Sequence, residues 1–143
     1  SSTNMAQVNL VNKQVQMDLI EIIKFQLITH CYINRINLSE LDLDCLTYLG
    51  LLGEVELTDF CNQMAEKRLR DKMKTWKPSP DKPGEKKPDS SPQTIRNVLI
   101  KAEKENMILK NGRGRKKITL NPSLKVQTTG NILLNYKLLR VDS

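Results

Sequence analysis

The stretch from Ser91 to Leu120 constrains the fold of this chain most, because a helix start, an amphipathic helix and a glycine-rich turn follow one another there. Ser91 is a favourable N-cap and Pro92 suits the first helical position, so a helix is predicted from there to about Glu105. Asn106 is expected to end it in a left-handed conformation. Apolar side chains recur at helical spacing and predict a buried stripe of Ile95, Val98, Leu99 and Ala102.

The opposite side of this helix mixes amides, cations, a hydroxyl and one isoleucine. Such side chains read base edges and bind phosphates in a major groove, whereas an ordinary solvated face is richer in Glu–Lys pairs. We therefore expect DNA contacts here, with Gln93, Arg96, Asn97 and Ile100 facing bases and with Thr94, Lys101 and Lys104 at the flanking phosphates. In the competing interpretation the face is solvated and Ile100 contacts the preceding helix.

A basic β-hairpin is predicted directly after the helix. Met107–Lys110 and Lys117–Leu120 are the expected strands, and the Asn111-Gly112 pair between them is a strong turn signal. A tip that is basic and rich in glycine can bring its backbone close to phosphates or to a minor groove. Five basic residues and no acidic one lie in this stretch, and all five are expected DNA contacts: Lys110, Arg113, Arg115, Lys116 and Lys117. The alternative is an exposed hairpin with ordinary charged residues.

Residues 16–34 form a second strong pattern, an apolar segment long enough for a helix. One helical face would carry Leu19, Ile20, Ile23, Leu27 and Cys31, and further apolar side chains extend beyond it. A helix that is apolar nearly all round has two surfaces to bury. It is either a dimerisation helix or an internal core helix. Residues 7–15 alternate weakly and fit a short strand or a loose arm.

Two more helices are predicted before Ser91. Ser39 is a suitable N-cap for the first, with Asp42 three residues on and Gly53 just past the end. Residues 54–57 fit a very short strand. Thr58 is expected to cap the second of these helices.

Residues 70–92 differ sharply in composition, since five of the six prolines lie here among Lys, Asp and Ser. Prolines break helices and this composition buries little apolar surface, so a flexible basic insertion of about twenty residues is expected. Trp76 within it either stacks on a base or packs against its own domain.

After Pro122, the alternation over residues 132–138 predicts a second hairpin around residues 129–131. A short helix that packs on the N-terminal helix of a partner is the alternative there.

Charge is segregated along the chain. Residues 1–69 carry five basic and nine acidic side chains, whereas residues 93–143 carry 11 basic and three acidic ones, within a net charge of +7. This asymmetry favours a polyanionic partner for the second half of the chain.

Several functional classes are disfavoured by the sequence. No apolar run reaches the roughly 18 residues that span a bilayer. Cys31, Cys45 and Cys61 are 14 and 16 residues apart, which suits neither a metal knuckle nor a disulfide framework, so reduced core thiols in a cytoplasmic protein are expected. His30 is the only histidine and no catalytic motif is present, so neither an enzyme nor a bound metal or cofactor is expected.

Residues 38–122 resemble winged helix-turn-helix DNA-binding proteins, in particular MarR-like regulators and plasmid or phage replication proteins. LTDFCNQMAEK resembles their second helix, SPQTIRNVLIKAEKENMILK their recognition helix, and NGRGRKKITLNP their wing. The chain departs from that pattern in the insertion of residues 70–92, and in Ala102 and Asn106, where the family usually has Leu and Gly. LDCLTYLGLLGEVELTDFC is also similar to small winged-helix proteins of crAss-like tailed phages.

The resemblance implies a mainly α fold with a small β-hairpin wing, to which the composition of residues 70–92 adds a disordered insertion. An arm and a helix over residues 1–37 precede this module, and a hairpin or short helix over residues 123–143 follows it. The implied function is sequence-selective binding of double-stranded DNA as a transcription regulator. The apolar pattern of residues 16–34 is where a homodimer contact is expected, with an internal core helix as the alternative. The alternative is a virion structural or protein-interaction module that keeps the winged fold without reading DNA and binds other virion proteins.

Overall fold

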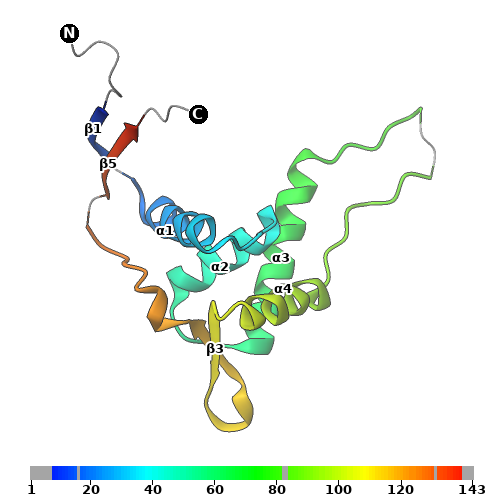
Figure 1. Ribbon diagram of the computed structural model, residues 1–143. Helices are drawn as coiled ribbons and strands as arrows, with labels where there is room; N and C mark the ends of the chain where they lie inside the picture. The colour runs from blue at the N-terminus through cyan, green and yellow to red at the C-terminus, as the bar shows by residue number, and fades with distance from the viewer. Residues whose placement is uncertain (1–7, 16, 82–83, 131, 140–143) are drawn as a thin grey trace.

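The computed structural model describes residues 8–15, 17–81, 84–130 and 132–139 (Figure 1). Within these ranges the chain forms four α-helices, namely α1 (Leu19–Asn34), α2 (Glu40–Leu52), α3 (Leu57–Thr75) and α4 (Pro92–Lys104). The same ranges contain five strands, namely β1 (Val8–Val15), β2 (Val55–Glu56), β3 (Ile108–Asn111), β4 (Lys117–Leu120) and β5 (Ile132–Leu139). Short 3-10 turns, η2 (Arg113–Arg115) and η3 (Pro122–Leu124), follow β3 and β4. The fold is mainly helical, as predicted.

A small antiparallel sheet lies beside the helices, with the strand order β2-β4-β3. β4 is its central strand, because Ile118 pairs with Val55 on one side and with Lys110 on the other. The element order of helix, short strand, two helices and hairpin agrees with the prediction. Four helices with this sheet are compatible with a winged-helix-like fold.

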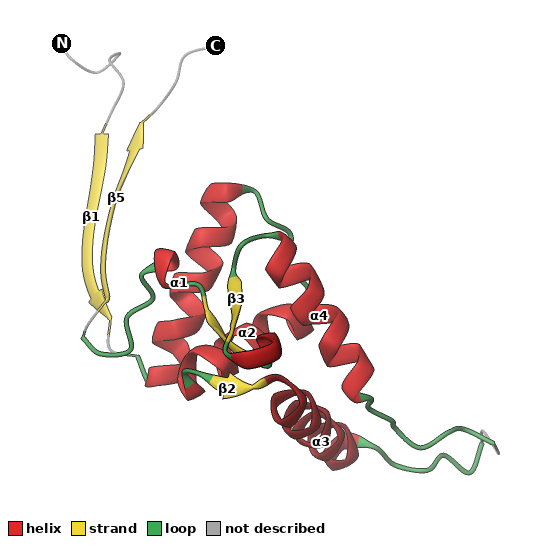
Figure 2. Cartoon of the chain, turned by 90° about the horizontal axis from the view of Figure 1, so that it is seen from below, coloured by secondary structure: helices red, strands yellow, loops and turns green. Residues whose placement is uncertain are grey.

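A separate two-stranded ribbon joins the two ends of the described chain, and Figure 2 shows it projecting from the helical body. In this terminal ribbon, β1 pairs antiparallel with β5, from Val8 opposite Leu139 to Val15 opposite Ile132. The strand predicted over residues 132–138 is confirmed, and the alternative helix is wrong. The predicted hairpin partner is also wrong, because β5 pairs with β1 rather than with a neighbouring segment. The remainder of the predicted arm and tail, residues 1–7, 131 and 140–143, lies outside the described residues.

One hydrophobic core lies between the four helices and the sheet. The predicted stripe of α4 is buried, and Ile23, Leu27 and Cys31 bury the inner face of α1. Each fully buried Leu, Ile or Phe contributes about 1.5–3 kcal/mol to folding relative to an exposed one. All three cysteines are free and buried, as predicted. Burial raises the pKa of Cys45 to about 12, so its thiol stays protonated.

Gly50 lies where α2, α1 and β4 meet. A Cβ atom at this position would be 2.8 Å from Leu120 Cδ1 and 2.9 Å from Ile23 Cγ2. Only glycine therefore lets both neighbours approach α2 so closely.

The residue that caps α2 is the predicted one, whereas the residue that caps α3 is not. Ser39 and Asp42 form the expected capping box of α2, and Gly53 ends that helix with φ at 81°. At α3, however, the carboxylate of Glu56 accepts a hydrogen bond from Asp59 N at 2.7 Å and caps the helix one residue before it starts. The prediction of Thr58 as the cap is wrong.

The connection between α3 and α4 is shorter than the predicted insertion of residues 70–92. α3 continues to Thr75, and Pro92 already belongs to α4. An (i, i+4) ion pair between Lys67 and Asp71, at 3.2 Å, supports the extra helical turns. The described residues of the connection form a loop that reaches away from the helices (Figure 1). Trp76 is half-buried at its start, and Lys72 Nζ donates to Asp89 O at 2.8 Å near its end.

Candidate nucleic-acid interface

α4 begins and ends where the sequence predicted. Ser91 Oγ accepts a hydrogen bond from Gln93 N at 3.1 Å, and Pro92 occupies the first turn. At the other end Asn106 has φ at 57°, and Met107 N donates to Ala102 O at 2.9 Å. This turn directs the chain straight into β3, so the hairpin follows the helix after three residues.

One line of side chains on α4 points away from the core and is exposed. Spacings of four, three and four residues place its members on one side of the helix. This set, the α4 strip, consists of Gln93, Asn97, Ile100 and Lys104. Gln93 Nε2 donates to Asn97 Oδ1 at 3.0 Å, and 46% of Ile100 is exposed. Asn97, Ile100 and Lys104 line a shallow depression.

Lys101 and Arg96, on the two flanks of the strip, bind other parts of the protein instead of remaining free. Lys101 Nζ lies 2.6 Å from Oδ2 of the buried Asp42 on α2. Arg96 Nη2 donates to Thr58 Oγ1 on α3 at 2.9 Å. Thr94 is half-buried, and its backbone N–H donates to Ser91 O at 3.1 Å. The structure therefore places Arg96 and Lys101 where they also position α4, whereas Thr94 lies in the first turn of α4.

Two carboxylates beside α4 have lowered pKa values. Burial alone would raise the pKa of Asp42, but hydrogen bonds from Lys101 and Ser39 and the positive charge of Lys101 outweigh burial and lower it. The backbone N–H of Asp59 is the main cause of the lowered pKa of Glu56. Both groups are therefore ionised at neutral pH.

The hairpin formed by β3, β4 and the tip between them is called the wing below. Its strands agree with the predicted ones within one residue, and Asn111 is still paired with Lys117. The turn is consequently a five-residue tip, residues 112–116, rather than a tight Asn-Gly turn. Gly112 and Gly114 have φ at 79° and 69°, which only glycine adopts readily, and the whole tip is exposed.

Acidic side chains neutralise part of the wing. Glu103 on α4 accepts from Arg115 Nη2 at 3.1 Å and lies 3.8 Å from Lys110 Nζ. Lys117 Nζ is 3.9 Å from Glu54, where both side chains are largely exposed. Arg113 and Lys116 are exposed and form no ion pair with any described residue.

These contacts place the α4 strip and the wing next to each other. Arg96 and Glu103 are seven residues apart and so lie on the same flank of α4. Because Glu103 binds the wing, the wing follows this flank, whereas Lys101 on the other flank faces α2. Figure 1 shows the hairpin continuing from the end of α4. The α4 strip and the wing together form one surface, which we name the strip–wing surface.

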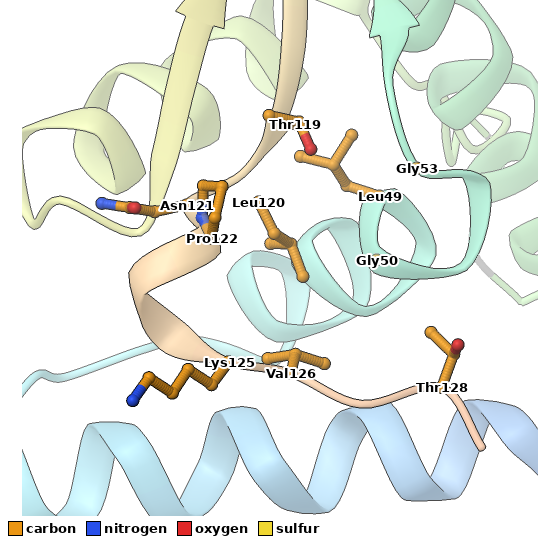
Figure 3. Close-up of a pocket in the computed structure, with 10 residues that line it drawn as sticks. All are labelled: Leu49, Gly50, Gly53, Thr119, Leu120, Asn121, Pro122, Lys125, Val126 and Thr128. Carbon is orange, nitrogen blue, oxygen red and sulfur yellow. The ribbon is translucent and has the colours of Figure 1, made fainter.

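A second concavity lies between α2, the end of β4 and residues 121–128 (Figure 3). Its lining is largely apolar, as at Leu49, Leu120 and Val126, and Lys125 is its one titratable side chain. Gln26 on α1 binds the segment along its rim, donating to Gln127 O at 2.7 Å and accepting from Gln127 N at 2.8 Å. The residues that line this pocket include no acid–base pair, so they offer no groups for proton transfer.

Comparisons with protein-family models, curated proteins and solved structures found no match for this chain. In the described residues no group of three or more His, Cys, Asp or Glu side chains is arranged to bind a metal ion. Of the helices described, none has both the length and the apolar character needed to cross a membrane.

Four partners of the predicted site residues are not apparent from the sequence, namely Asp42, Glu54, Thr58 and Glu103. Asp42 and Lys101 are 59 residues apart in the sequence, and Thr58 and Arg96 are 38 apart. No local pattern connects residues at such separations. Glu103 is only 12 residues from Arg115, and the predicted order of helix and hairpin could have suggested their contact.

Proposed function

We propose that this protein is a winged helix-turn-helix module that binds double-stranded DNA sequence-selectively and regulates transcription. The observation that carries the proposal is the strip–wing surface, in which an exposed amide-rich helix face lies directly beside a basic, glycine-containing hairpin. Its buried free thiols suit a reducing cytoplasm.

The order and pairing of the elements support this assignment. α2, β2, α3, α4 and the β3–β4 hairpin correspond to the successive elements of a winged helix, and α4 takes the position of the recognition helix. The long connection between α3 and α4 does not separate these helices. They pack directly on each other, and Arg96 binds Thr58 across them.

The α4 strip supplies the proposed base contacts. The amides of Gln93 and Asn97 match the donor and acceptor pattern of adenine, and Ile100 suits a thymine methyl group. Lys104 binds a flanking phosphate. Arg96 and Lys101 act mainly as positioning residues, because they orient α4 against α3 and α2.

The wing supplies the proposed backbone contacts. Arg113 and Lys116 are free to bind phosphates at once. Arg115 and Lys117 first leave Glu103 and Glu54, which costs little, since ion pairs of exposed cations contribute about 0–1 kcal/mol. Lys110, whose side chain is only 22% exposed, also leaves Glu103, from which it is 3.8 Å away. Phosphates therefore replace the carboxylates when duplex is present.

The experiment is a titration of a fluorescent random duplex over a series of salt concentrations. The double variant Arg113→Ala/Lys116→Ala is expected to weaken binding and to flatten the slope of log K against log salt by about two, roughly one unit per lost phosphate contact. The matched control is Lys24→Ala/Lys67→Ala, which removes the same charge where α1, α2 and α3 meet.

Equal losses in the two double variants would mean that net charge alone drives binding. An unchanged slope in the wing variant would contradict the wing contacts. Absence of any duplex affinity, together with a stoichiometric place in a larger particle, would instead support the virion structural module.

Selectivity is tested by Asn97→Ala, which should reduce discrimination between selected and random duplexes by about 1–3 kcal/mol.

A further inference from the structure

The outer side of α1 carries large apolar side chains that the rest of the described chain leaves uncovered. Its inner face is buried against the core, but 48% of Ile28 and 86% of Tyr32 are exposed. Exposed apolar surface of this kind marks interaction sites in soluble proteins. The question is which partner fits it.

Side chains on the outer side of α1 form a stripe with an internal symmetry. Glu21, the half-buried Phe25, Ile28 and Tyr32 follow one another on the helix at spacings of four, three and four residues, which places them along one side of it. Arg35, the residue that caps the C-terminal end of α1, follows three residues later. Ile28 is the midpoint. Phe25 precedes Ile28 and Tyr32 follows it. The acidic Glu21 lies before Phe25, and the basic Arg35 lies after Tyr32. Glu21 and Arg35 are both exposed, and neither forms an ion pair with a described residue.

We infer that a second copy of this chain binds this stripe, with two α1 helices packed antiparallel about a two-fold axis at Ile28. In that arrangement Ile28 meets Ile28 of the second copy, and Phe25 meets its Tyr32. Glu21 meets Arg35 at each end. A two-fold interface requires such a self-complementary patch, because each contact between two different residues occurs twice, once on each side of the axis.

Charge disfavours the parallel alternative. Parallel helices in register would place Glu21 against Glu21 and Arg35 against Arg35, two like-charge contacts that repel. Antiparallel packing also opposes the helix dipoles favourably. A membrane surface suits the stripe less well, since helices that bind membranes carry several Lys and Arg on their polar face. Here Arg35 is the one base of the stripe, and Glu21 opposes it.

Neither the segment of residues 121–128 nor the strip–wing surface occupies the stripe. Gln26, which binds Gln127, lies about 160° around the helix from Ile28. The strip–wing surface is built from α4 and the wing, none of which belongs to the stripe. The inference is therefore independent of the proposed DNA binding.

The test is sedimentation equilibrium of the full chain without DNA, with circular dichroism to establish that each variant is folded. The unchanged chain is expected to be a dimer, and Ile28→Glu, which places two carboxylates at the axis, is expected to be a monomer. Ile33→Glu is the matched control, because Ile33 is 71% exposed on the same helix but about 140° around it from Ile28. This variant should remain a dimer.

The orientation is tested by exchanging the end charges. Glu21→Arg should raise the dissociation constant of the dimer about tenfold, because two exposed attractions become repulsions. Glu21→Arg/Arg35→Glu should restore it. A monomeric unchanged chain, a folded Ile28→Glu variant that still dimerises, or a double variant without recovery would each overturn the inference. Loss of DNA binding in a chain that still dimerises would affect only the proposed function.

Discussion

Asp42 links two helices that are far apart in the sequence. Its Oδ2 atom accepts from Ser39 N at 3.0 Å, which caps α2, and from Lys101 Nζ at 2.6 Å, which fixes α4. The side chain of Asp42 is only 9% exposed, so its charge depends on these partners. One carboxylate thus sets the position of the proposed recognition helix against the helix that supports it.

Replacing this carboxylate should therefore lower stability in a pH-dependent way. Asp42→Asn is expected to reduce the free energy of unfolding at pH 7 by about 1–2 kcal/mol, a value below that of a fully buried pair because Lys101 is half-exposed. The pKa of Asp42 is lowered in the folded state, so its contribution is complete above the ordinary aspartate pKa of about 3.9. It is lost as the pH falls through the lower, folded value.

Urea unfolding of both chains at neutral pH and at decreasing pH below that ordinary value measures this effect. The difference in the free energy of unfolding between the unchanged chain and Asp42→Asn should shrink on acidification. Asp44→Asn is the control, since Asp44 is 3.9 Å from Lys24 and both side chains are largely exposed. Asp44→Asn should lower the free energy of unfolding by less than about 0.5 kcal/mol. A pH-independent difference at Asp42 would contradict the ionic explanation.

At the scale of elements, Glu103 joins the wing to α4. It binds Arg115 and Lys110, and so holds two cations of the strip–wing surface in the absence of DNA. The contact has two consequences. It orients the wing along the helix, and it competes with phosphate for the same side chains.

Glu103→Gln should consequently strengthen DNA binding. We expect an increase in affinity of about two- to tenfold and a steeper salt slope, because two cations no longer have to leave a carboxylate. Stability should change by less than about 1 kcal/mol. Titration of a random duplex at several salt concentrations measures both quantities.

Glu66→Gln on α3 serves as the comparison, since it removes the same charge from an exposed position outside the strip–wing surface. The same gain in both variants would show that net charge, and not release of the wing, is responsible. Weaker binding by Glu103→Gln would indicate that the wing needs Glu103 for its orientation.

At the scale of the whole molecule, Gly50 sets how closely the N-terminal helix, α2 and the sheet approach one another. Gly50→Val is expected to lower the free energy of unfolding by about 1–3 kcal/mol, since the added methyl groups would overlap Ile23 and Leu120. Thermal or urea unfolding measures it. Leu52→Val, at an exposed position of the same helix, should cost only about 0.5 kcal/mol, which reflects helix propensity. Similar losses in both variants would contradict the close packing.

Local signals explain which parts of this molecule could be predicted. The Ser91–Pro92 start, the buried stripe of α4, the left-handed Asn106 and the capping box of Ser39 each depend on residues within one or two helical turns. The hairpin strands were predicted within one residue for the same reason. The architecture around the candidate site therefore follows largely from the sequence.

Long-range contacts explain the rest. The pairing of β1 with β5 and the ion pair of Asp42 with Lys101 join residues that no local pattern connects. Residues 70–75 belong to α3 and not to the predicted insertion, because they are charged like the proline-rich segment but precede its first proline, Pro78. Arg96 and Lys101 were predicted to face DNA because their partners on α3 and α2 could not be foreseen.

The terminal ribbon has a consequence for how the chain is made. β1 leaves the ribosome before any of the helices described here, and its partner β5 leaves after all of them. The Gln26–Gln127 contact alone spans 101 residues, which take roughly 5–20 s to synthesise at typical rates of translation. Throughout that time the backbone N–H and C=O groups of β1 lack their strand partner and can pair with another nascent chain. The helical body can assemble first, so the ribbon closes only after the four helices described here have been made, and until then β1 is an unpaired edge.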